Sequence, residues 1–112
     1  MNDPILTIKQ IEKVLLAALD LDFTGRLGAF AATRILVADL EAELECRLPD
    51  GSGYLHEKLV GLKWHIGAMF GFDIDNGHDA QDHLVWALGN LSTLRSNFER
   101  LAHSEHPGSL AG

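Results

Sequence analysis

The chain has 112 residues, which is enough for one domain built on one hydrophobic core. Sixteen Asp and Glu residues against nine Lys and Arg give a net charge of −7, and no cluster of basic residues is present, which argues against nucleic acid and membrane surfaces as partners. Cys46 is the only cysteine and the N-terminus lacks a signal-peptide pattern, so we expect a cytoplasmic protein without an internal disulfide.

The first half of the chain predicts two helices, over residues 4–21 and 25–48. Asp3 followed by Pro4 is a typical helix start, because the Asp side chain can cap the first turn and Pro is tolerated there. Thr24 is the predicted cap of the second helix. Their apolar stripes follow helical spacing and comprise Ile5, Ile8, Ile11, Leu15 and Leu19, then Phe30, Val37, Leu40, Leu44 and Leu48.

The second half predicts two long helices, over residues 53–71 and 77–104, that fold back on each other. A turn-rich stretch at 49–53 precedes them, and the break at 71–77 is too short for anything except an antiparallel reversal. Gly71 is a natural helix end, and Asn76 is the predicted cap of the last helix. The apolar stripes comprise Leu55, Leu59, Leu62, Ile66 and Met69, then Leu84, Ala87, Leu91, Leu94, Phe98 and Leu101.

Four amphipathic helices with short links predict an all-α fold, an antiparallel four-helix bundle made of two helical hairpins. We expect residues 1–112 to form a single helical-bundle domain with a loose tail at 107–112, after Pro107 and Gly108 stop the last helix.

Acidic residues and two tryptophans are the candidates for a partner-binding surface. Along the second predicted helix, acidic side chains recur at Asp39, Glu41, Glu43 and Glu45. Such a series is either a solvated helix surface or a recognition surface for a protein with a basic groove, where charge accelerates association. The tryptophans are Trp64 and Trp86. An exposed Trp is a common binding anchor.

The tryptophans have two further interpretations. If the third helix is buried on all sides, Trp64 fills the core of the domain. If the protein is a homodimer, an interface between two copies accommodates both Trp64 and Trp86, and the small residues Gly67 and Gly71 let a partner backbone approach closely.

The six histidines raise the alternative of a metal site. If the second hairpin is symmetric about Ile74, His65 and His83 lie at the same level along the paired helices. Asp79 stands four residues before His83, on the same helix face. Together they would supply two imidazoles and a carboxylate, ligands that zinc or iron accepts. The chain contains no Glu-x-x-His pair of the di-iron type.

A helical bundle with a histidine inside one helix resembles the histidine phosphotransfer domains. Their pattern places Lys three and Gly four residues after the phosphorylated histidine. After His56 in this chain, Lys58 follows at two residues and Gly61 at five. Because a Lys two residues along a helix points away from the imidazole, the resemblance does not carry the phosphorylation over.

The sequence contains no nucleophile elbow, no Gly-rich phosphate loop and no other catalytic signature. The leading hypothesis is therefore a non-enzymatic module that binds a protein partner, as a small acidic regulator, adaptor or inhibitor. No cofactor, nucleic acid or membrane is expected. The alternative is a metal-binding bundle or one resembling the phosphotransfer domains.

Overall fold

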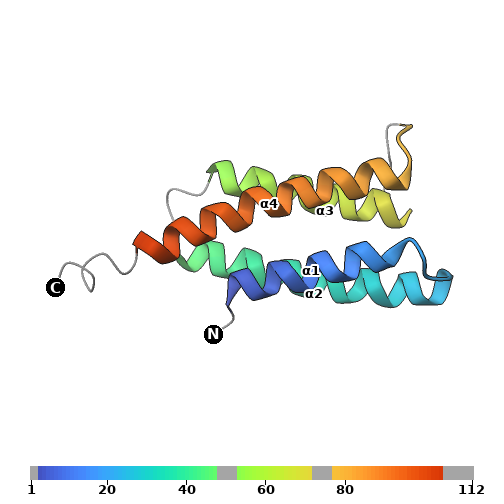
Figure 1. Cartoon of the computed structure of the whole chain (residues 1–112), viewed down its shortest axis with the longest axis horizontal. Coiled ribbons are helices and arrows are strands. Elements are labelled where there is room, and N and C mark those ends of the chain that lie inside the picture. The colour runs from blue at the N-terminus through green and yellow to red at the C-terminus, as the bar shows by residue number, and fades with distance from the viewer. Residues whose placement is uncertain (1–2, 48–52, 72–76, 105–112) are drawn as a thin grey trace.

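The computed structural model describes residues 3–47, 53–71 and 77–104, and these residues form helices without any strand (Figure 1). The four helices are α1 (Pro4–Ala18), α2 (Phe23–Arg47), α3 (Gly53–Phe70) and α4 (Ala80–Ser104). The predicted all-α fold is confirmed. The predicted turn at 49–52, the predicted cap Asn76 and the predicted tail at 107–112 lie outside the described residues.

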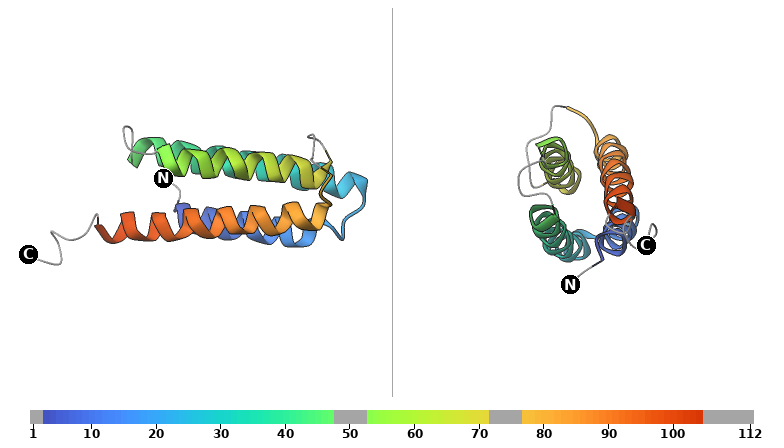
Figure 2. Two further views of the ribbon diagram at one scale, coloured as in Figure 1. Left: turned by 90° about the horizontal axis from the view of Figure 1, so that it is seen from above. Right: turned by 90° about the vertical axis from the view of Figure 1, so that its left-hand side faces the viewer.

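The helices form a four-sided bundle. The α3–α4 and α1–α2 contacts are the most extensive, and α1 also packs on α4 and α2 on α3. The end-on view in Figure 2 places α1 diagonally opposite α3. Figure 1 shows that α1 and α3 end where α2 and α4 begin, so neighbouring helices are antiparallel.

One hydrophobic core joins the four helices and confirms most of the predicted stripe positions. Burial of a whole Leu, Ile or Phe side chain contributes about 1.5–3 kcal/mol, so these positions dominate the stability of the bundle. Ile5, Leu19, Phe30 and Leu101 are only partly buried at its edge. The fully or almost fully buried members include Ile8, Ile11, Leu15, Val37, Leu40, Leu44, Leu59, Leu62, Ile66, Leu91, Leu94 and Phe98.

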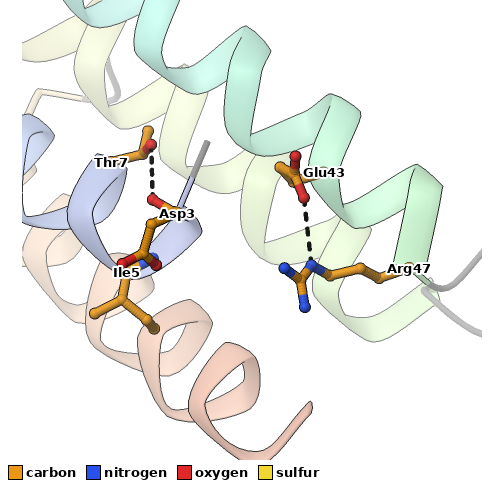
Figure 3. A network of polar contacts seen from close by, with 5 residues as sticks. All are labelled: Asp3, Ile5, Thr7, Glu43 and Arg47. Carbon is orange, nitrogen blue, oxygen red and sulfur yellow. Dashed lines mark hydrogen bonds and ion pairs between the residues drawn. The ribbon is translucent and has the colours of Figure 1, made fainter. Parts of the chain in front are cut away.

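The start of α1 confirms the predicted Asp-Pro cap (Figure 3). Asp3 Oδ1 accepts a hydrogen bond from the backbone N–H of Ile5 at 3.0 Å, and Pro4 is the first helical residue. The Thr7 hydroxyl donates to the backbone carbonyl of Asp3 at 3.1 Å. These bonds satisfy groups that the helix itself leaves without partners.

The end of α1 comes three residues earlier than predicted, at Ala18. The amides of Asp20 and Leu21 donate to carbonyls three residues before them, which tightens the chain into a turn. The Arg26 guanidinium then donates to the carbonyl oxygens of Leu19 and Leu21, at 3.0 and 3.1 Å. A side chain of the next helix therefore satisfies carbonyls that a longer α1 would have bonded internally.

The predicted cap of α2 was wrong. The helix begins at Phe23, and Asp22 Oδ1, not Thr24, accepts the amide hydrogen of Gly25 at 2.8 Å. A carboxylate just outside the helix reaches an amide of its first turn, whereas Thr24 is already inside the helix.

The predicted start of α4 at residue 77 was also wrong. Gly77 has a left-handed backbone with φ +84°, and the helix begins at Ala80. Asp79 Oδ1 caps it by accepting from the amide of Asp82 at 2.9 Å. At the end of α3, Gly71 has φ +82°, which confirms the predicted glycine stop. Within the described ranges, no helix combines the length and hydropathy that a membrane span needs.

Candidate functional site

Two histidines meet between α3 and α4. The Nδ1 atoms of His65 and His83 lie 3.1 Å apart, a distance at which one ring donates a hydrogen bond and the other accepts it. His83 is fully buried, and its Nε2 has no hydrogen-bond partner in the part of the chain that the structure describes. The prediction that these two histidines lie at the same level of the hairpin is confirmed.

Aromatic rings surround this pair. The Trp64 and Trp86 ring centroids lie 5.2 and 5.5 Å from that of His83, and both rings are nearly perpendicular to the imidazole. The His78 ring packs edge-on against Trp86 at 4.8 Å. We call these five residues, Trp64, His65, His78, His83 and Trp86, the aromatic–histidine cluster. Trp64 is half-buried and Trp86 is 39% exposed, so the cluster reaches from the core to the surface.

Electrostatics in the cluster disfavour a charged His65. Burial lowers the pKa of His65 below its ordinary 6.5, and the charge of a protonated His83 lowers it further. The neutral form of the His65 imidazole is therefore favoured near pH 7.

The structure brings together two of the three predicted metal ligands. The third, Asp79, directs its carboxylate to the first turn of α4, where it accepts from the amide of Asp82. The rings of Trp64 and Trp86 offer no ligand atom, because indole nitrogen only donates. Among residues 3–47, 53–71 and 77–104, no three or more His, Cys, Asp or Glu side chains are grouped to hold a metal ion.

On its other side, α3 leaves a groove against α2. Its cavity volume is about 690 Å³. The lining residues on α2 are Leu27, Phe30, Thr33, Arg34, Val37, Ala38 and Glu41, and those on α3 are Lys63, Ile66 and Gly67. Phe30 contacts Phe70 with ring centroids 5.5 Å apart, so these two rings join the helices beside the groove.

Charged side chains stand at the rim of the α2–α3 groove. Lys63 Nζ lies 2.7 Å from Glu41 Oε2, in an ion pair between the two helices. The Arg34 guanidinium lies 5.9 Å from the centre of the Phe30 ring, within the range of a cation–π contact. The groove therefore combines an apolar lining with cationic and anionic groups.

The predicted acidic surface is partly neutralised by the protein's own cations. Glu41 pairs with Lys63, and Glu43 pairs with Arg47 at 3.3 Å (Figure 3). Asp39 is half-buried and Glu45 is exposed. The acidic residues stand on α2, whereas Trp64 and Trp86 lie between α3 and α4. The six predicted binding residues are thus divided between two sides of α3.

His56, the histidine of the phosphotransfer resemblance, is half-buried near the start of α3. Its Nδ1 is buried and has no hydrogen-bond partner within the described residues. Gly53, Glu57 and Val60 join it in lining a shallow hollow of about 520 Å³.

No protein-family model, curated protein or solved structure gives a significant match to this chain.

The sequence did not predict two features of the structure, the α2–α3 groove and the burial of His83. The burial of His83 could have been predicted from helical spacing, because His83 lies four residues before Ala87 of the apolar stripe and therefore on the same helix face.

Proposed function

We propose that this chain is a non-enzymatic protein-binding module, and that the α2–α3 groove receives an amphipathic helix of the partner. The observation that carries this proposal is the groove itself, which is open between two core helices and lined by both apolar and charged side chains. Grooves of this kind bind helices through apolar side chains at three- and four-residue steps. The module would act as a regulator, adaptor or inhibitor in the cytoplasm.

The side chains of α2 change from apolar at one end of the groove to acidic at the other, and this change indicates the chemistry of the partner helix. Phe23 and Leu27 are 69% and 42% exposed at one end, four residues apart on the same helix face. At the other end, Glu41 and Glu45 continue the face beyond Ala38, and Glu45 forms no ion pair with another described residue. The matching helix has an apolar turn that meets Leu27 and a basic turn that meets Glu45.

A basic partner is favoured over a second copy of this chain. Each copy carries a net charge of −7, so two copies repel each other, whereas a basic segment is attracted during diffusion. Light scattering on untagged protein distinguishes the two. A stable dimer that the groove substitution below disrupts would assign the groove to self-association instead.

The test fills the groove without changing the core. Ala38 is exposed on α2 and lines the groove, so Ala38→Trp should block it; Ala42, also exposed on α2 and outside the groove lining, offers Ala42→Trp as the matched control. Affinity capture from a lysate with quantitative mass spectrometry should retain one partner on the wild type and on the control. Ala38→Trp should lower its recovery at least about tenfold, and Glu45→Lys should lower it less.

A peptide from the captured partner completes the test. Its amphipathic, basic segment should bind the wild type with 1:1 stoichiometry by calorimetry and should shift backbone amide resonances around residues 27–45 and 63–67. Equal capture by all variants, or resonance shifts centred on Trp86, would remove the groove as the binding site.

A further inference from the structure

The contact between His65 and His83 depends on how many protons the two rings carry. With one proton between the two Nδ1 atoms, one ring donates to the other across 3.1 Å. When both rings are fully protonated, each is positively charged and carries a hydrogen on its Nδ1, so two N–H donors face each other at that distance. The hydrogen bond is then lost and replaced by repulsion between like charges, which is strong in a buried site.

We propose that the His65–His83 pair is an acid-sensitive contact that holds α3 against α4 at neutral pH and separates the two helices locally when both rings are protonated. The opening is centred on Trp64 and Trp86, because their rings pack on His83. This inference goes beyond the proposed function, since the pair lies on the side of α3 away from the groove.

Among the residues that the structure describes, neither His65 nor His83 forms an ion pair that would offset the second charge. On α4, the His78 ring, 6.2 Å from the His83 ring, carries no negative charge. The nearby carboxylates have other partners, since Asp82 Oδ2 lies 3.7 Å from His78 Nδ1 and Asp79 Oδ1 caps the helix. On α3, Lys63 is directed to Glu41 of α2. In the ranges that the structure describes, α1 and α2 place no charged side chain in hydrogen-bonding or ion-pair contact with either ring.

Burial of His83 makes water a poor substitute for a carboxylate at its ring. His83 has no exposed surface, so a charge on its ring would lie away from solvent, beside an Nε2 that already has no partner. The rings of Trp64 and Trp86 pack on His83 but carry no negative charge that would neutralise two imidazolium ions.

The direction of the pH dependence follows from His65. Its pKa is lowered in the folded protein, by burial first and by the charge of His83 second, below the 6.5 of the unfolded chain. Between these two values the unfolded chain binds more protons than the folded protein does. Stability from this group is therefore complete above pH 6.5 and is lost as the pH falls from 6.5 through the lowered pKa.

The first experiment uses the wild-type chain, so it does not depend on any variant folding. Nitrogen-15 NMR of the histidine rings should show one Nδ1 protonated and the other not at pH 7.5. The His65 ring should titrate below pH 6.5, and amides around residues 64–66 and 83–86 should shift with the same midpoint. A His65 titration at or above 6.5, or amides that do not follow it, would overturn the proposal.

A matched pair of variants then distinguishes the acid sensitivity of the His65–His83 contact from the acid sensitivity of the rest of the protein. His65→Gln keeps a polar side chain that cannot become charged, and His78→Gln removes an exposed histidine of the same cluster. Between pH 7.5 and 5.0, the wild type and His78→Gln should lose about 4 °C or more of Tm beyond the loss in His65→Gln. Parallel losses in all three proteins would contradict the proposal. If His65→Gln does not fold, the wild-type titration decides alone.

Discussion

The two sides of α3 differ in how completely they are closed. Against α4, the side chains of His65 and Trp64 meet those of His83 and Trp86, and the contact between the two helices is the most extensive in the bundle. Against α2, an ion pair and one aromatic contact flank an open groove. One helix is thus closely packed on the side of α4 and leaves an open groove on the side of α2.

Small and large residues on α3 account for this difference. Gly61 faces α4, where an added Cβ would lie 3.0 Å from Asn90 Nδ2, so the Asn90 side chain packs directly on the α3 backbone. Towards α2, the long side chain of Lys63 spans the gap to Glu41. A side chain packed on a backbone fills the interface at Gly61, whereas a bridge between long polar side chains leaves space beneath it.

The largest expected effect on stability comes from truncating a buried residue of α4. Truncation of an exposed residue at the groove is the comparison. Leu91 is fully buried, so Leu91→Ala should lower the free energy of unfolding by about 2–5 kcal/mol. Leu27 is 42% exposed, so Leu27→Ala should change it by about 0.5 kcal/mol or less.

Urea denaturation followed by circular dichroism measures both changes. Similar losses in Leu91→Ala and Leu27→Ala would mean that the groove residue belongs to the stabilising core. The division of α3 into a stabilising side and a binding side would then be wrong.

Periodicity was sufficient to predict the helices and the levels at which they face each other. The apolar stripes of the second hairpin place His65 opposite His83, because two helices joined by a short break must run antiparallel in a limited register. The caps were harder. Several polar residues near each break can cap a helix, and the backbone course decides that Asp22 and Asp79 do so.

The groove and the aromatic surroundings of the histidines could not be predicted in the same way. Both depend on the distance between helices, which side-chain packing sets after folding and which spacing along one helix does not contain. The sequence singled out Trp64 and Trp86 as separate candidates, but their common contact with His83 requires the packed hairpin.

An intermediate effect is expected at the start of α4, which positions the closed side. Asp79→Ala removes the hydrogen bond to the amide of Asp82 and a favourable charge near the helix N-terminus, so it should cost about 1 kcal/mol of unfolding free energy. Asp82→Ala, an exposed carboxylate three residues further on, is the control and should cost less. Hydrogen exchange at residues 80–84 should rise only in Asp79→Ala; equal exchange in both variants would reassign the cap.

The smallest effect is expected from the ion pair that spans the open side. Lys63 is exposed, and measured coupling energies for such pairs are about 0.2–1 kcal/mol. A double-mutant cycle of Lys63→Met and Glu41→Gln should give a value in this range at low salt, and salt should reduce it because the pair is in contact with water. The Arg47–Glu43 pair within α2 serves as the reference, since its residues are four apart on one helix and do not join two helices. If breaking the Lys63–Glu41 pair cost several kcal/mol, it would be holding α2 and α3 together. The groove would then be a structural gap closed by a strong link, and a partner helix could not displace the bridge to bind there.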